Sequence, residues 1–175
     1  ENPNIPPIVI TDFQILHKPV AVGYDPNWER TILSKSISET ELIELKHYDN
    51  ILSFEFAALD FHSPEKNRYA YMLEGFDKVW IRSGSRRFVT YTNLNPGEYN
   101  FKVKSTNSDG VWNENFKQLK VIIAPPWWQT PYAIGLYALI SILGVWGIIK
   151  FQTYRTRLQQ ELKMQEFEAH HLREV

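Results

Sequence analysis

Alternating apolar and polar residues run through much of the chain before residue 125. In ILSFEFAALDF, Leu52, Phe54 and Phe56 fall on one face, with smaller or polar residues on the other. The segment GEYNFKVKSTN, which starts at Gly97, repeats the pattern with aromatic or aliphatic residues at every second position. A period of two residues predicts a β-strand with one buried face.

Six or seven segments of this kind lie between residues 5 and 124, separated by turns rich in Pro, Gly, Asn and Asp. In the first of them, the pattern predicts one face with Val9, Thr11, Phe13 and Ile15 and the opposite face with Ile8, Ile10 and Leu16. Short strands at this spacing predict a mainly β fold, an immunoglobulin-like or fibronectin III-like β-sandwich over residues 1–126.

The pattern changes completely after the last of these strands. No charged residue occurs between Trp127 and Ile149, and nine residues from Tyr132 to Ile149 are Ile, Leu or Val. From Pro131, about 19 residues would form a helix of roughly 28 Å, close to the ~30 Å hydrocarbon core of a bilayer. Trp and Tyr at both ends suit the two interfaces. A buried core helix is the alternative, but it would carry a polar stripe, so we predict a transmembrane helix over residues 127–150.

Basic residues decide the expected orientation. Lys150, Arg155 and Arg157 follow the span closely, and positively charged flanks stay in the cytoplasm. The outer part has no Asn-x-Ser/Thr acceptor, which favours a bacterial periplasm. We therefore expect a single-pass protein of a bacterial inner membrane, with the N-terminal domain in the periplasm and the C-terminus in the cytoplasm. Export of such a domain needs an upstream signal, so we also expect sequence before Glu1.

Residues 151–175 lack Gly and Pro and are rich in good helix formers. Apolar residues recur at seven-residue spacing, which predicts that the membrane helix continues into a cytoplasmic, coiled-coil-like helix of a dimer. The seam positions are Leu158, Leu162, Ala169 and Leu172, with Phe151 and Gln165 completing the repeat. A membrane-proximal helix that pairs only when more sequence follows is the alternative.

Composition removes several kinds of chemistry. The chain has no cysteine, which excludes disulfides, cysteine nucleophiles and Cys-based metal sites. Its formal net charge of −1 provides no general attraction to nucleic acid. Metal-ligand spacing and glycine-rich phosphate loops are absent from the sequence, so we expect no metal and no cofactor.

A tyrosine at the start of one strand is the sharpest local signal. In NLNPGEYNF, the Pro96-Gly97 turn precedes Tyr99, whose hydroxyl would bond back to the backbone as a tyrosine corner. The wider stretch from Tyr69 to Trp112 resembles the Y_Y_Y domain, which is named for its tyrosines. The residues that carry the resemblance are Tyr71, Trp80, Tyr91, Pro96, Gly97, Tyr99 and Trp112, together with Leu73-Glu74-Gly75.

The resemblance covers about residues 5–124, and the order of strand, Pro-Pro, Trp-Trp, single span and charged helix extends it to Val175. It implies a segment of a hybrid two-component sensor histidine kinase of the kind found in gut Bacteroidetes. The implied partners in the same chain are a β-propeller sensor upstream and a kinase downstream. We also expect a homodimer through the sandwich, the membrane helix and the coiled coil.

The adjacent His170 and His171 are candidate phosphoacceptors for such a kinase. The acceptor helix resembles His-Glu-Phe/Leu-Arg-Thr-Pro, whereas His171 is followed by Leu-Arg-Glu without a proline. We therefore expect these histidines to be solvated, no catalytic residue in this segment, and the acceptor beyond Val175.

The connection between the last strand and the span is short. Pro125 and Pro126 favour extended backbone, and Trp127 and Trp128 suit the lipid interface. A stiff connection transmits a movement that a long Gly/Ser linker would absorb. We therefore predict a signal-transducing connector that relays ligand sensing across the membrane to the kinase.

The alternative function is a membrane-anchored carbohydrate-binding or adhesion module. Its candidate residues are Trp28, Trp80 and Trp112, because aromatic faces suit sugar rings. We expect packing within the core, or against an upstream domain, to be the commoner role of these tryptophans.

Overall fold

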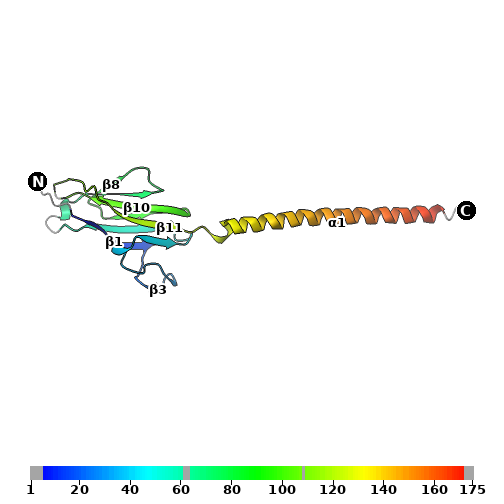
Figure 1. Cartoon of the computed structure of the whole chain (residues 1–175), viewed down its shortest axis with the longest axis horizontal. Coiled ribbons are helices and arrows are strands. Elements are labelled where there is room, and N and C mark those ends of the chain that lie inside the picture. The colour runs from blue at the N-terminus through cyan, green and yellow to red at the C-terminus, as the bar shows by residue number, and fades with distance from the viewer. Residues whose placement is uncertain (1–5, 61–63, 108, 172–175) are drawn as a thin grey trace. The chain divides into compact units, whose positions relative to one another are not determined.

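The computed structural model describes residues 6–60, 64–107 and 109–171, with helix side chains through Gln165. The chain divides into two compact units at the Pro126–Trp127 bond: the first is built of strands and the second is a helix (Figure 1). The strands are β1 (Ile8–Ile15), β2 (Lys18–Pro19), β3 (Tyr24–Asp25), β4 (Arg30–Thr31), β5 (Leu42–Leu45), β6 (Leu52–Ala58), β7 (Tyr69–Glu74), β8 (Ile81–Gly84), β9 (Phe88–Tyr91), β10 (Gly97–Ser105) and β11 (Lys117–Ile123). The helices are the 3₁₀ turns η1 (Ile37–Glu39), η2 (Pro64–Lys66) and η3 (Trp127–Gln129) and the α-helix α1 (Pro131–His171).

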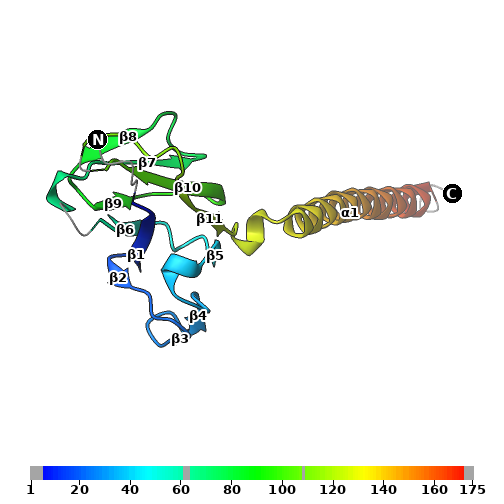
Figure 2. The same ribbon diagram turned by 60° about the vertical axis from the view of Figure 1, so that its left-hand side comes forward.

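Two sheets face each other in the first unit, as the two layers of arrows in Figure 1 show. One sheet has the order β2-β1-β6-β9 and the other β5-β11-β10-β7-β8. Only β5 and β11 pair in parallel within these two sheets of the described residues. A small ribbon of β3 and β4 lies outside the two layers (Figure 2). The predicted sandwich followed by one long apolar helix is confirmed, with more strands than the expected six or seven.

Aromatic packing between β6 and β10 joins the two sheets. The rings of Phe54 and Phe101 are stacked, with centroids 4.1 Å apart and planes within 9°. Phe13 lies 5.4 Å from Phe54, and Phe56 lies 5.5 Å from Tyr69. All five rings are at most 1% exposed, so they form the centre of the core. The predicted alternation in β6 and β10 therefore describes the buried face correctly.

The predicted faces of β1 are wrong in their first half. The pairing of β1 with β6 shifts between Ile10 and Asp12, which leaves Thr11 as the extra residue of a β-bulge. Ile8 and Ile10 before the bulge are buried together with Phe13 and Ile15 after it, whereas Thr11 is exposed. A bulge advances the two-residue period by one position, and strict alternation across it assigns half of the strand to the wrong face.

The sandwich has an end at which β11 leaves it, called here the exit end. It consists of the turns at residues 16–17, 46–50, 75–79 and 92–97 and of Ala124–Pro126. The pairings Ile123–Gly97 and Ile123–Leu45 bring the last residue of β11 beside the start of β10 and the end of β5. Backbone hydrogen bonds from Leu16 to Ile51 and from Leu94 to Asn50 gather the turns of the other sheet there.

Tyr99 and Gly75 fix two of these turns against each other. The Tyr99 hydroxyl donates a 2.8 Å hydrogen bond to the Asn95 carbonyl, which closes the turn before β10 as a tyrosine corner does. Gly75 has a φ of +96°, and a Cβ added there would lie 2.9 Å from the Glu98 carbonyl oxygen and 3.2 Å from the Tyr99 ring. A glycine is therefore required both by the backbone conformation and by the lack of space.

The second unit is one unbroken α-helix. Its 41 residues span roughly 62 Å at 1.5 Å per residue. The helix continues without interruption through Lys150, where the sequence turns from apolar to charged. Leu158 and Leu162 are exposed in the single chain, Ala169 lies on the same helix, and Leu172 falls outside the described residues. The coiled coil therefore stays a prediction.

Replacing Tyr99 by Phe should lower the free energy of unfolding by about 1 kcal/mol, because the Asn95 carbonyl loses its donor while the ring packing is kept. Urea unfolding of the chain in mild detergent, followed by tryptophan fluorescence, measures the change. Tyr24→Phe is the matched control, because Tyr24 is exposed and its hydroxyl has no hydrogen bond within the described residues. Equal effects of the two substitutions would contradict a role for the corner bond.

Gly75→Ala should destabilise the sandwich by roughly 2–4 kcal/mol, through the left-handed backbone and the clash with the Glu98 carbonyl. Gly110→Ala is the control, because Gly110 also has a positive φ of +82° but a Cβ there would meet open space. The same unfolding measurement on both variants separates the cost of the backbone conformation from the cost of the contact. An equal or smaller loss for Gly75→Ala than for the control would show that the contact with the Glu98 carbonyl adds no cost.

Candidate functional site at the exit end of the sandwich

A partly buried hydrogen bond between Tyr91 and Asp77 holds the turn after β7. The Tyr91 hydroxyl donates to an Asp77 carboxylate oxygen at 2.5 Å, and the same oxygen accepts the Leu73 backbone N–H at 2.8 Å. Burial, and then the hydrogen bond to Asp77, raise the pKa of Tyr91 above its usual range, so it remains a neutral donor. Burial likewise raises the pKa of Tyr71, whose ring meets that of Tyr91 edge-on at 6.2 Å.

A fully buried carboxylate, that of Asp49, organises the turn after β5. Asp49 is fully buried, forms an ion pair with Arg30 of β4, and accepts the Lys46 backbone N–H at 2.9 Å. Arg30 also donates to the Tyr48 hydroxyl at 3.3 Å. These contacts join the β3–β4 ribbon to the exit end and leave the Tyr48 ring exposed.

The last strand stays bonded to its sheet up to the prolines. The Ala124 N–H donates to the Leu45 carbonyl at 2.8 Å, one residue beyond the end of β11. Pro125 and Pro126, which follow at once, have no backbone N–H to donate. The sandwich therefore keeps its chain in a fixed hydrogen-bonding pattern to the last residue before the prolines.

The helical unit begins with a well-formed cap. Thr130 donates its hydroxyl to the Trp127 carbonyl at 2.7 Å, and the same hydroxyl accepts the Ala133 N–H at 3.4 Å. Pro131 occupies the first helical position, where its missing N–H costs nothing. Trp127 and Trp128 form an edge-on pair in η3, 5.8 Å apart. Helical structure thus begins at Trp127 and Trp128, the aromatic residues expected at the membrane interface.

From its start at Pro131, α1 is long and apolar enough to cross a membrane. Two of its hydroxyl side chains within and just after the apolar stretch bond back to the helix: Ser141 donates to the Tyr137 carbonyl at 2.8 Å and Thr153 to the Ile149 carbonyl at 2.8 Å. Such back-bonding satisfies these two hydroxyl donors without water. The first cation, Lys150, lies 5.6 Å from the ring of Trp146, as expected at an interface.

The tryptophans considered for sugar binding lie elsewhere. Trp28 packs partly buried against the core. Trp80 and Trp112 lie on the outer face of the five-stranded sheet, where Lys104 Nζ is 4.7 Å from one ring centroid and 5.6 Å from the other. Arg82 also covers Trp112, at 5.9 Å. Cations therefore occupy faces of these rings that a sugar would need.

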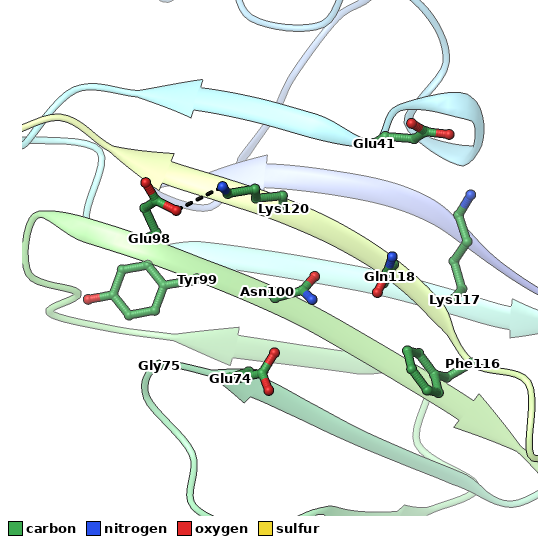
Figure 3. Close-up of a pocket in the computed structure, with 10 residues that line it drawn as sticks. All are labelled: Glu41, Glu74, Gly75, Glu98, Tyr99, Asn100, Phe116, Lys117, Gln118 and Lys120. Carbon is green, nitrogen blue, oxygen red and sulfur yellow. Dashed lines mark ion pairs between the residues drawn. The ribbon is translucent and has the colours of Figure 1, made fainter.

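Beside them lies a shallow depression of about 760 Å³ on the same outer face (Figure 3). Its floor carries the Glu98–Lys120 ion pair of 2.8 Å, drawn as a dashed line, and Phe116 lies at one side. Lys102 lies 5.4 Å from the Phe116 ring and pairs with Glu74 at 2.8 Å, which lowers the pKa of Glu74. Most charges on this face thus have partners on the face itself. No group of three His, Asp or Glu side chains suited to a metal occurs in the described residues.

The structure gathers some predicted residues and separates others. Tyr71, Tyr91, Pro96, Gly97 and Tyr99 lie in or next to the exit end, whereas Trp80 and Trp112 lie on the outer sheet face. The side chains of His170 and His171 fall outside the described part of the helix.

Sequence reasoning missed three residues of the site. Asp49 and Asp77 gave no signal, because each depends on a partner distant in sequence. Thr130 did give one, since a threonine directly before proline is a helix start signal.

Comparisons with known proteins agree with this arrangement. Residues 60–124 match the Y_Y_Y domain family. A curated protein named Histidine kinase P4, from Formosa agariphila, is 31% identical over 170 residues, which are 97% of this chain and 12% of that protein. The match therefore includes the helix as well as the sandwich.

Solved structures give the same picture. The crystal structure of the extracellular domain of the putative hybrid two-component system BT4673 from B. thetaiotaomicron is 32% identical, with a TM-score of 0.58, over 70% of this chain and 16% of that chain. The corresponding domain of the putative hybrid two-component system BT3049 is 32% identical, with a TM-score of 0.54, over 71% and 16%. The chain spans about an eighth to a sixth of the length of these relatives. It contains a Y_Y_Y domain and is homologous to a segment of a histidine kinase.

Proposed function

We propose that this chain is the connector of a membrane sensor histidine kinase, relaying a movement of its outer domains to the kinase. The observation that carries the proposal is the order of structure around residues 124–130. A strand hydrogen-bonded up to Ala124 leads through two prolines to a capped helix that is apolar enough to cross a membrane. The alignment with the homologous histidine kinase extends over both units of this chain.

The proposed relay uses a pair of chains. A ligand-driven change in the distance or angle between two sandwiches displaces two membrane helices relative to each other. Because α1 is continuous from Pro131 to His171, the same helix delivers that displacement beyond the apolar stretch to the predicted coiled-coil seam. The basic residues after Ile149 support a cytoplasmic C-terminus and an outer sandwich, in a bacterial inner membrane.

The proposal assigns no catalytic step to residues 1–175 and places the phosphoacceptor further along the chain. Tyr91 and Tyr99, with hydrogen bonds to Asp77 and Asn95, are assigned a structural role in keeping the exit end rigid. The carbohydrate-binding alternative receives less support, because cations cover faces of Trp80 and Trp112.

A flexible insertion tests the relay. Gly-Ser-Gly-Ser placed after Pro126 of the full-length sensor should remove the ligand-dependent change in autophosphorylation, because a flexible segment absorbs the movement. The same insertion after Gly110, in an exposed turn with open space, is the control and should preserve the response. An unchanged response with the insertion after Pro126 would contradict the proposed mechanism.

A further inference from the structure

The exit end cannot lie far from the lipid, if α1 crosses the membrane as proposed. Seven residues, Ala124–Thr130, lie between the end of β11 at Ile123 and the start of α1 at Pro131. Fully extended, they reach at most about 25 Å, and the 3₁₀ turn η3 reduces this to roughly 20 Å. The turns of the exit end are therefore the part of the sandwich closest along the chain to the headgroups.

Apolar side chains project from these turns into solvent. Phe76 is 52% exposed, Tyr48 is 50% exposed, and Leu16 is 39% exposed. They belong to three separate turns, after β7, β5 and β1. Aromatic and aliphatic side chains of this kind favour the interfacial region of a bilayer.

The charges of the exit end are distributed unevenly between the interior and the surface. Asp49 is buried against Arg30, Asp77 is bonded to Tyr91, and Glu98 is paired with Lys120. The carboxylates of these turns and of the adjoining β10 are thus neutralised or engaged within the protein. Glu44 on the edge strand β5 is exposed and faces away from the core.

Lys46 and Lys78 in these turns, and Lys18 of β2 directly after the turn at residues 16–17, are exposed. Within the described residues, Lys18, Lys46 and Lys78 form no ion pair with a carboxylate, although Lys46 lies 5.7 Å from the Tyr48 ring. Each lies two residues along the chain from one of the exposed apolar residues. Cationic and apolar side chains side by side suit a surface that is both anionic and oily.

We propose that the exit end binds the anionic phospholipid headgroups around the start of α1, through Lys18, Lys46 and Lys78 with Phe76, Tyr48 and Leu16. The inference rests on the proposed membrane span and adds a second attachment to it. Docking of the turns onto the lipid restricts the tilt of the sandwich. Because docking depends on anionic headgroups, the charge of the lipid controls how much of the sandwich movement reaches α1.

The test uses the whole chain in vesicles of phosphatidylcholine alone or with a phosphatidylglycerol fraction. Because the chain has no cysteine, Thr92→Cys provides one labelling site in an exposed exit-end turn. Energy transfer from a donor at this site to headgroup-labelled lipid measures the approach of the turn to the membrane. Transfer should increase with phosphatidylglycerol and decrease between 0.1 and 1 M salt, where the Debye length falls from about 10 to 3 Å.

Matched charge variants identify the residues responsible. Lys46→Gln with Lys78→Gln should shift the ratio of docked to undocked chains by roughly five-fold for each lysine removed. Lys66→Gln with Lys117→Gln removes the same charge at the opposite end of the sandwich and should leave the transfer unchanged.

The outcomes separate the two proposals. A chain that does not float with the vesicles contradicts the membrane span itself. A chain that floats but shows equal transfer in both lipids, or equal effects of the two lysine pairs, overturns only the lipid contact. Energy transfer that depends on the number of chains per vesicle, and not on the lipid charge, would also overturn the lipid contact. It would show that the exit end binds a second copy of the chain.

Discussion

The stack of Phe54 on Phe101 is the contact on which the sandwich depends. It is the closest approach of aromatic rings among the described residues, and it joins the central strands of the two sheets. Because β6 and β10 each pair with strands on both sides, this contact fixes every other strand of the two layers relative to the core. The turns at the exit end inherit their positions from it. The proposed relay through those turns therefore depends on a core that contains no functional group of its own.

Two tyrosines, Tyr91 and Tyr99, connect the packed core to the turns of the exit end. Tyr91 and Tyr99 have rings in the interior and hydroxyls at the edge, where each hydroxyl closes a turn by bonding to Asp77 or Asn95. A phenylalanine would provide the same packing but leave the turn without its donor. The requirement for tyrosine at these positions thus follows from a need to join buried packing to exposed backbone, and it explains why both sit near strand ends.

Much of this architecture could be predicted from the sequence, and the failures have physical causes. In β6, β7 and β10 the predicted series of every second residue is buried, because one face of each strand meets the core. β1 misled the prediction because its bulge at Thr11 leaves no mark in the hydrophobic pattern. β2, β3 and β4 have two residues each, too few for any period. Asp49 and Asp77 are defined by partners 19 and 14 residues away, so only the folded register reveals them. The long apolar helix was predictable because the run without charged residues from Trp127 to Ile149 is visible in the sequence itself.

The surface of α1 shows what this helix still lacks in the single chain. Its backbone is hydrogen-bonded internally, its cap is complete at Thr130, and Ser141 bonds within the helix. The aliphatic side chains from Ile134 to Ile149 nevertheless remain more than half exposed in the single chain. Burying such groups is favourable by about 25 cal/mol for each Å² removed from water. The requirement left by these apolar side chains is removal from water. Lipid would meet it on every side, and a second helix could meet it on one side without competing for the backbone or Ser141 hydrogen bonds. The same surface therefore permits both insertion and pairing, which is what a relay of helix movements requires.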